Sequence, residues 1–415
     1  MLKRLALILS GMALALPIMA QDSTITLTVA GWSSNPAEDA ALNARLEAFM
    51  AENPGISVRF VPSTDHNVTM QTAFASGTYP EVFYIDSSRL PDWATAGVVA
   101  IGDEDIEDLD GFYPALLDVF TFEGDLYCPP KDFSTMALQY NKDLFDAAGL
   151  EYPTADWTWD ELRAAAEALT NPEAGVIGLV TPPNLERWLP FLYQAGGAIF
   201  NEDGEYVMDS PEALEALEFY VGMVADGIAG PPSRVDSGWG GEAFGRGRAA
   251  MAMEGNWVIQ FLLDNYPELN WGVAEMPAGP AGRATMAFTV CYGVAGNLSG
   301  DKLDAAWALV NFLTNDEGAL SVASASFGPM PTRPSAAQAY LDNWAARTEG
   351  SGVNFEDFEA FIAGGEYSYP WVLPVGFQPF VDAFNAGLQR AFDGQATAED
   401  VLAEVAVIAN ELLSR

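Results

Sequence analysis

The sequence predicts an α/β protein of two lobes, each built on a mainly parallel sheet flanked by helices. Three observations predict it. The chain of 415 residues is longer than an ordinary domain with a single hydrophobic core, and it fits two domains of roughly 150 to 200 residues each. Half of the residues are hydrophobic, which is enough to build large cores. Segments with strand periodicity also alternate with segments of helical periodicity, an order typical of parallel sheets.

The first 20 residues have the layout of a secretory signal. Met1-Leu2-Lys3-Arg4 supplies positive charge, an apolar run over 5–18 follows, and Ala20 provides the small residue near a cleavage site. The run is shorter than the roughly 20 residues of a membrane-spanning helix. We therefore expect a signal peptide over 1–20, a mature chain from Gln21 and a location in a periplasm. Because no cysteine ends this segment, no lipid anchor is expected.

The next segment predicts a β-α-β-α-β unit. Its elements are a strand over 25–30, a helix with Leu42, Leu46 and Phe49 at helical spacing, a strand over 56–61, a helix over 68–75 and a strand over 82–85. Strands joined through helices of this length are expected to be parallel, with right-handed crossovers. Ligands of such sheets bind beyond the carboxyl ends of the strands, which directs attention to the segments that follow each strand.

The middle and the end of the chain predict a second α/β lobe. Asp160 and Ser210-Pro211 mark helix starts, since Asp and Ser cap helices and proline is tolerated in the first turn. The further elements are strands at 176–180, 249–253 and 271–274, helices at about 301–314 and near 316, and a last helix from Thr397 and Asp400. The proline-rich segment 329–334 is expected to be a stiff linker.

The charge of the chain excludes several partners. It has 58 Asp and Glu against 18 Lys and Arg, a formal net charge of -40 at pH 7. Such a surface repels nucleic acid and anionic lipid, so neither is expected as a partner. A phosphate ligand calls for clustered basic residues, and the only lysines after the signal are Lys131, Lys142 and Lys302. Solubility alone also explains the acidity, which then says nothing about the ligand.

Histidine and cysteine are scarce. The single histidine, His66, leaves no zinc site built on several imidazoles and few Ser-His or Cys-His nucleophiles. The two cysteines, Cys128 and Cys291, are free to pair in an exported protein. No metal, cofactor or catalytic residue is expected.

Several segments, in their order along the chain, resemble one family. They are Gly31-Trp32; 79–86; 130–133 with 140–145; 157–162; 244–251 with 255–257; and 305–307 with 311–314. In this joint order the chain resembles the extracellular solute-binding proteins of ABC sugar importers, the maltose and multiple-sugar group. The matching segments are spread over most of the mature chain, although no single one is specific.

The resemblance implies the two-lobed periplasmic binding protein fold, type II, in which a multi-strand hinge joins two lobes of discontinuous chain. Carried onto this sequence, the lobes are 21–128 plus 292–328 and 129–291 plus 329–415, with hinge segments near 128–131, 290–292 and 327–331. The family layout places Cys128 and Cys291 on neighbouring hinge strands, so a disulfide is expected, and such a bond would limit hinge opening. Two separate buried thiols are the alternative.

A sugar needs hydrogen-bonding groups for its hydroxyls and aromatic rings for its C–H faces. Tryptophans in loop contexts are the aromatic candidates: Trp32, Trp239, Trp257 and Trp371, with Asn256 and Tyr369 beside the last two. A buried tryptophan belongs to the core more often than to a site, and Trp159, Trp188 and Trp307 are assigned to packing.

The polar candidates follow strands or the hinge. Asp86 ends a buried strand, and helix capping is its alternative role. Asp65 and His66 follow the second strand, although a lone histidine is more often structural. Arg333, near the third hinge segment, is expected either to donate to a sugar oxygen or to form a salt bridge.

These features together predict a monomeric, non-enzymatic binding protein. It would capture a neutral mono- to oligosaccharide by closing its lobes and deliver it to the permease subunits of an ABC importer. One alternative is a carbohydrate-active enzyme with two carboxylates about 5 to 9 Å apart. Another is a binding protein for a polyamine, a glycerol phosphodiester or a metal.

Overall fold

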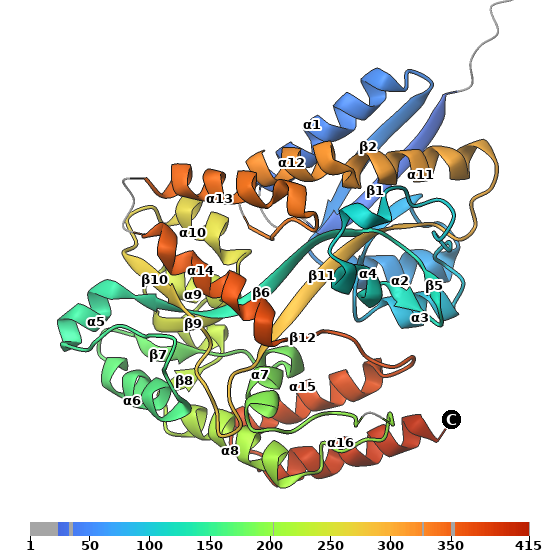
Figure 1. Ribbon diagram of the computed structural model, residues 1–415. Coiled ribbons are helices and arrows are strands. Elements are labelled where there is room, and N and C mark those ends of the chain that lie inside the picture. Colours follow the sequence, from blue (N-terminus) through green and yellow to red (C-terminus); the bar gives the residue numbers. More distant parts are fainter. Residues whose placement is uncertain (1–23, 33–35, 202, 326–327, 350–352, 415) are drawn as a thin grey trace, which may run out of the picture.

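The computed structural model describes residues 24–32, 36–201, 203–325, 328–349 and 353–414. It shows an α/β protein in which one continuous sheet, flanked by helices, runs through two lobes (Figure 1). The strand order is β2-β1-β3-β11-β6-β9-β7-β8, with β10 beside β6 and β12 beside β11. The predicted two-lobed α/β architecture is therefore confirmed. The predicted signal peptide over 1–20 and the start at Gln21 lie outside the described residues.

Buried hydrophobic side chains of the described residues form three clusters. The first is drawn from 27–128 and 291–313, and we call the part packed around it the first lobe. The other two are drawn from 136–286 and 330–409, and we call the part around them the second lobe. Trp159 and Trp188 are buried in the second lobe and Trp307 in the first, which confirms their packing role. The lobe boundaries at single residues stay a prediction.

The first lobe contains the predicted β-α-β-α-β unit. Its elements are β1 (Ile25–Trp32), α1 (Pro36–Glu52), β2 (Ile56–Ser63), α2 (His66–Ser76) and β3 (Val82–Asp86). Strand β1 pairs in parallel with β2 and with β3. The carboxyl ends of the three strands therefore lie at one edge of the sheet. The lobe also holds α3 (Leu90–Thr95), α4 (Pro114–Val119), the hairpin of β4 (Thr121–Phe122) and β5 (Asp125–Leu126), and α11 (Asp301–Thr314).

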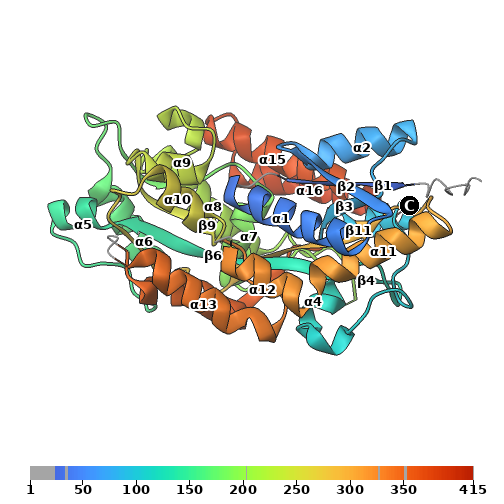
Figure 2. The same cartoon turned by 90° about the horizontal axis from the view of Figure 1, so that it is seen from above.

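Two long strands carry the sheet from one lobe into the other. Strand β11 (Thr285–Val294) pairs with β3 of the first lobe and with β6 (Pro130–Asn141), whose far end pairs with strands of the second lobe. A third crossing is marked by an isolated bridge between Phe133 and Met330. Helix α12 (Asp316–Ala325) packs against both α1 and α13 (Pro334–Thr348), and Figure 2 shows α12 and α13 along one side of the molecule. These crossings form the hinge that the family resemblance implied.

The second lobe joins parallel strands to the hinge strands. Strand β7 pairs in parallel with β8 and β9, whereas β9 and β10 pair antiparallel with β6. Its strands are β7 (Ile177–Val180), β8 (Ala229–Gly230), β9 (Ala249–Gly255), β10 (Trp271–Ala274) and β12 (Ser368–Pro370). Its helices include α5 (Lys142–Ala148), α6 (Trp159–Leu169), α7 (Leu185–Gln194), α8 (Pro211–Ala225), α9 (Gly240–Gly245), α10 (Val258–Asn265), α14 (Glu359–Gly364), α15 (Gln378–Phe392) and α16 (Ala398–Leu413).

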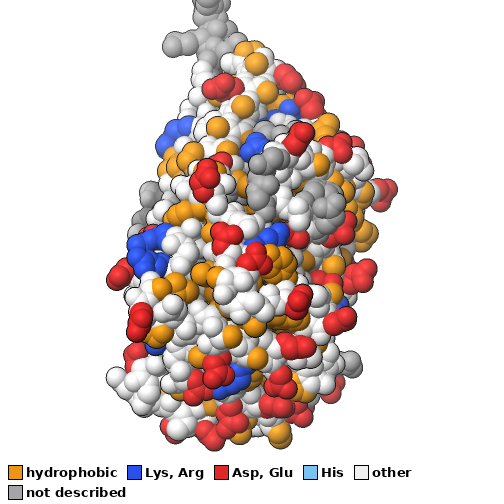
Figure 3. Space-filling model, turned by 90° about the vertical axis from the view of Figure 1, so that its left-hand side faces the viewer, with side chains coloured by type: hydrophobic (Ala, Val, Ile, Leu, Met, Phe, Trp, Pro, Cys, Tyr) orange, Lys and Arg blue, Asp and Glu red, His pale blue; other side chains and the backbone are white. Residues whose placement is uncertain are grey.

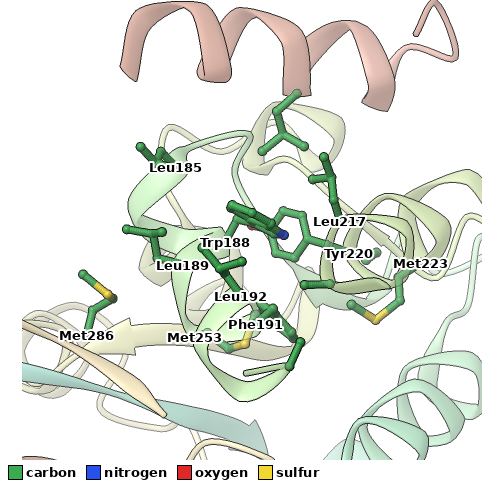
Figure 4. Packing of buried hydrophobic residues seen from close by; sticks show 14 of the residues in the cluster. Leu185, Trp188, Leu189, Phe191, Leu192, Leu217, Tyr220, Met223, Met253 and Met286 are labelled. Atoms are coloured by element: carbon green, nitrogen blue, oxygen red, sulfur yellow. The ribbon is translucent and has the colours of Figure 1, made fainter. Parts of the chain in front are cut away.

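Helix starts in this lobe follow from local capping. Ser210 caps α8, and Thr397 with Asp400 forms a capping box at α16, both as predicted. Helix α6 instead begins after Thr158, whose capping box uses Glu161, so Asp160 is not the cap. Figure 4 shows Trp188 of α7 beside Tyr220 of α8 in the core that these helices build. None of the helices in the described ranges is long and apolar enough to cross a lipid bilayer.

The predicted disulfide between Cys128 and Cys291 is present, with Cα atoms 5.7 Å apart. Cys291 on β11 faces Pro130 of β6 in the sheet, and both cysteines are fully buried in the first-lobe cluster. The bond therefore joins two segments of the same lobe. It anchors the hinge strands at their first-lobe ends, and the expectation that it would limit hinge opening stays a prediction.

Candidate ligand-binding cleft

A cleft of about 1110 Å³ lies between the lobes. The first lobe contributes the ends of β1 and β3, the starts of α1 and α2 and the turn before α3, and the hinge contributes parts of β6 and β11. The second lobe contributes the starts of α7 and α9 and one face of α15. The cleft thus lies beyond the carboxyl ends of the parallel strands, as the β-α-β order predicted.

Aromatic side chains line both walls. Trp32 and Tyr84 come from the first lobe, Trp239, Trp257, Phe261 and Trp371 from the second, and Phe288 from β11. The ring of Trp32 lies 4.6 Å from that of His66, and the ring of Trp257 meets Phe288 edge-on at 5.5 Å. The three rings Trp32, Trp239 and Trp257 are half-buried, so each is supported by protein on one side and keeps exposed surface.

Three glycines explain how the rings reach these positions. A Cβ atom added at Gly31 would lie 2.5 Å from the ring of Tyr84. One added at Gly241 would lie 2.2 Å from Trp239, and one at Gly255 would lie 2.2 Å from Trp257. Only glycine leaves room for a ring to lie against the backbone at such a distance. These glycines therefore leave room for the rings of Tyr84, Trp239 and Trp257 against the backbone.

Lys131 lies in the cleft lining on hinge strand β6. Its Nζ lies 2.9 Å from Glu38 Oε1, pairs also with Asp132, and lies 5.0 Å from the centroid of the Tyr84 ring. Burial by itself lowers the pKa of Lys131, but the charges of Asp132 and Glu38 outweigh it and hold that pKa well above its ordinary value. Burial raises the pKa of Asp132, against the opposing effect of Lys131. The Lys131 charge is therefore held between two carboxylates within the lining.

A second ion pair supports Trp257. Arg187 Nη2 lies 2.9 Å from Glu254 Oε2, and the indole nitrogen of Trp257 donates to the same oxygen at 3.2 Å. Glu254 is only 3% exposed. Burial raises the pKa of Glu254, while Arg187 and the Trp257 hydrogen bond act in the opposite direction.

Asp86 caps a turn, as its alternative role required, and it also lines the cleft, while its contact with a sugar stays a prediction. Its Oδ1 accepts hydrogen bonds from the Ser88 amide at 2.9 Å and the Ser88 hydroxyl at 2.6 Å. Burial raises the pKa of Asp86, and the Ser88 hydrogen bonds oppose the shift. Nearby, Asn67 Oδ1 and Arg89 Nε are buried lining atoms without a hydrogen-bond partner among the described residues. Buried polar atoms are normally satisfied, so these two are exceptions in the wall of the cleft.

The structure brings half of the predicted site residues together. Five line the cleft: Trp32, Asp86, Trp239, Trp257 and Trp371. Five others are absent from its lining: Asp65, His66, Asn256, Arg333 and Tyr369. That the first five contact a ligand stays a prediction. The second five lie outside the lining and have protein neighbours.

Asp65 and His66 lie at the start of α2. Asp65 is exposed at the N-cap position without a capping hydrogen bond from its side chain, while the neighbouring residues Thr64 and Asn67 line the cleft. His66 is fully buried, and its Nε2 lies 2.9 Å from the carbonyl oxygen of Tyr84. Since a carbonyl only accepts, this geometry assigns the proton to Nε2. His66 therefore supports the ring of Trp32 from behind.

We expect the His66 ring to titrate below its ordinary pKa of 6.5, because burial lowers its pKa. The fold then favours the neutral ring, so its stability contribution is present above pH 6.5 and is lost as the pH falls below it. As the chain has one histidine, the ring proton resonance reports it alone. His66→Gln should show a smaller loss of stability than wild type between neutral pH and about pH 5. A midpoint at or above 6.5 would contradict the burial effect.

The remaining three residues have structural partners. Asn256 is buried and donates to the carbonyl oxygen of Gly328 at 2.7 Å. Arg333 is 1% exposed, pairs with Asp108 at 2.6 Å and Asp316 at 3.3 Å, and so has the salt bridge that was its alternative. Tyr369 stacks on Tyr193, with ring centroids 4.0 Å apart. Trp371, two residues later, is held instead by Ser87, whose hydroxyl donates to its carbonyl oxygen at 2.7 Å.

Sequence reasoning missed several lining residues. Arg187, Glu254, Arg89 and the polar face of α15, which presents Gln378, Asn385 and Gln389, were not proposed. The α15 face has a helical spacing that is visible in the sequence. Arg187 is one of few basic residues in an acidic chain, so its scarcity was also a usable signal. Figure 3 illustrates the charge balance, with acidic side chains scattered over the face and few basic ones.

The described residues contain no group of three or more His, Cys, Asp or Glu side chains placed to hold a metal ion. The lining instead combines aromatic faces, amides, hydroxyls and internally paired charges. Such a surface is suited to binding an uncharged, hydroxyl-rich molecule with flat apolar faces.

Comparison with known proteins agrees with this geometry. A putative binding protein of Brucella abortus (strain 2308) is 27% identical over 435 residues, covering 98% of either chain. The lactose-binding protein of Rhizobium radiobacter is 27% identical over 232 residues, covering 53% of either chain. The structure of an ABC substrate-binding protein from Listeria monocytogenes in complex with cycloalternan is 28% identical, covers 94% of this chain and 99% of that chain, and superposes with a TM-score of 0.83.

Family assignment rests on a match to a whole family, which covers more than half of the chain. The family described as bacterial extracellular solute-binding protein matches residues 44–349. That span begins in α1 and ends after α13, so it includes the hinge strands and most cleft residues of both lobes, but not Trp32, Glu38, Trp371 or the residues of α15. The chain belongs to the family of bacterial extracellular solute-binding proteins.

Proposed function

We propose that the protein captures a neutral mono- to oligosaccharide between its lobes and delivers it to the permease subunits of an ABC importer. It does so in a periplasm, as a monomer and without chemical change to the sugar. The observation that carries the proposal is the cleft lining, in which aromatic rings from both lobes face a space whose strongest charges are already paired.

The aromatic rings match the chemistry of a sugar. Pyranose rings have C–H faces that pack on aromatic side chains, and Trp32 and Trp257 offer such surfaces from opposite lobes. Around them, Asn67, Arg89 and Gln378 supply polar groups for hydroxyls. The volume of about 1110 Å³ exceeds what one monosaccharide fills, which favours the oligosaccharide end of the range.

The charges argue against the alternative ligands. Lys131 forms ion pairs with Glu38 and Asp132, and Arg187 forms one with Glu254. These two cations are therefore not available as a cluster that binds a phosphodiester. The same pairings occupy Glu38, Asp132 and Glu254, three of the five carboxylates in the lining, which leaves few for a polyamine cage. Because these three acids are held in ion pairs, they are poorly placed to act as the acid and nucleophile of a hydrolase, which supports binding over catalysis.

Relatives support the carbohydrate class. One relative is described as a lactose-binding protein, and the structure from Listeria monocytogenes holds cycloalternan. Both names refer to carbohydrates, and the second protein is matched over nearly the whole of both chains.

Lobe closure follows from the split lining. Contacts from Trp32 and Asp86 on one side and from Trp239 and Trp257 on the other reach one sugar together only when the lobes meet. The sugar therefore binds the closed form better and shifts the population toward it.

We expect a thermal-shift screen of neutral saccharides to identify at least one that raises the melting temperature, because a ligand of the folded state stabilises it. A sugar at a hundredfold excess over its Kd contributes about 2.7 kcal/mol. The sugar should be recovered unchanged, and small-angle scattering with that sugar should give a smaller radius of gyration. A glycerol phosphodiester and spermidine serve as negative controls. Turnover of a glycoside by pure protein, or a shift with spermidine alone, would overturn the proposal.

A further inference from the structure

We propose that the buried ion pair of Arg187 and Glu254 sets the orientation of Trp257 and thereby the sugar specificity of the cleft. Both are positioning residues in this scheme, because they act on the ligand through the Trp257 ring. The inference rests on the proposed function and deepens it by naming the residues that fix its main stacking surface.

Glu254 lies on a rigid part of the sheet. It is part of β9, three residues before Trp257, and its backbone is held by Gln139 through two hydrogen bonds, one at 2.9 Å and one at 3.0 Å. Its Oε2 accepts from both Arg187 and Trp257. The carboxylate is therefore a fixed point to which the indole is attached.

The indole hydrogen bond restricts what Trp257 offers to a ligand. Tryptophan has one donor and no acceptor, and that donor is used by Glu254. Turning the ring would take one donor away from the buried Glu254 carboxylate, and leaving a buried polar group short of a partner is costly. Trp257 therefore presents a ring face for stacking and no hydrogen-bond donor, which selects sugars by the shape of their apolar face.

Arg187 fixes the ring from a different element. Its guanidinium carbon lies 5.3 Å from the centroid of the Trp257 ring and 5.7 Å from that of Phe288. Arg187 belongs to α7, Phe288 to hinge strand β11, and Trp257 precedes α10. The ring is thus held where two second-lobe elements and the hinge meet.

The same carboxylate reaches toward the second tryptophan loop. A Cβ atom added at Gly240, directly after Trp239, would lie 2.4 Å from Glu254 Oε1. One carboxylate thus lies against the segments that carry Trp239 and Trp257. A buried ion pair adds little net stability because of its desolvation cost, so orientation explains this pair better than stability does.

A double-mutant cycle tests the scheme with the sugar found in the thermal screen. Glu254→Gln should weaken binding roughly tenfold in wild type, within the coupling range of contacting residues, and change the ranking of sugars. In the Trp257→Ala background the same change should leave affinity unaltered. Glu275→Gln is the matched control, because Glu275 pairs with Arg283 at 3.0 Å and lies outside the cleft lining. Equal losses in both backgrounds would overturn the proposal.

A ligand-free measurement separates this inference from the proposed function. The indole N–H resonance of Trp257, identified by its loss in Trp257→Ala, should move in Glu254→Gln without any sugar. Gly240→Ala, which leaves both charges in place and displaces the carboxylate, should move the same resonance even if Glu254→Gln folds poorly. An unmoved resonance in Gly240→Ala would contradict the positioning role. If the resonance moves but no sugar binds, the proposed function fails and the positioning of Trp257 stands.

Discussion

Replacing Trp257 by alanine is expected to weaken sugar binding by about 1 to 3 kcal/mol, roughly 5- to 150-fold in Kd. The melting temperature of the ligand-free protein should change little. The reason is that the ring is half-buried in a solvent-facing cleft and packs on the backbone at Gly255, so its removal takes away a stacking surface and leaves the core intact. Isothermal titration calorimetry measures the affinity, and Trp32→Ala tests the opposite wall with the same expected range.

Trp159→Ala is the matched control for this prediction. Trp159 is 7% exposed, stacks on Phe219 at 4.6 Å and donates to Gln194 Oε1 at 2.6 Å. Its loss should lower stability by about 3 to 5 kcal/mol while the folded fraction keeps its affinity. If Trp257→Ala instead shows a large fall in melting temperature and unaltered affinity, then its ring belongs to the core.

Local sequence patterns predicted those parts of the sheet and of the cleft lining that depend on residues close together in the sequence. The alternation of strand and helix periodicity gave the first five elements in order, and parallel pairing then brings their carboxyl ends to one edge. Trp32 and Asp86 could be proposed because each ends a strand at that edge. The glycines beside Trp239 and Trp257 carried a similar local signal.

The missed and misplaced residues depend on contacts far apart in the sequence. Glu254 meets Arg187 across 67 residues, a pairing that no local spacing reveals. His66 follows a strand end as Asp86 does, yet it is the first residue of α2 and turns into the protein toward the Tyr84 carbonyl. Tyr369 and Trp371 are aromatic residues of the same segment in the sequence, but only Trp371 lines the cleft. The ring of Tyr369 stacks instead on Tyr193 of α7.

Removing the disulfide is expected to produce the largest loss of stability. The bond closes a separation of 163 residues, and the chain-entropy model assigns such a loop about 5 kcal/mol, an upper figure. Cys128→Ala, Cys291→Ala and the double variant should all show a similar loss, because each removes the same cross-link. Denaturant unfolding measures it. A double variant much less stable than either single one would assign the loss to packing, and two free thiols in oxidatively folded protein would refute the bond.

The same variants also test where the hinge moves. Both cysteines are buried in the first-lobe cluster, with Cys291 opposite Pro130 and Ile85 in the sheet. We therefore expect the cross-link to travel with the first lobe and the lobes to rotate about the parts of β6 and β11 that continue from it into the second lobe. On this geometry, the folded double variant should bind sugar and contract on binding as wild type does. If its affinity rises or its ligand-free radius of gyration grows, the bond restrains opening and the first-lobe anchoring role is wrong.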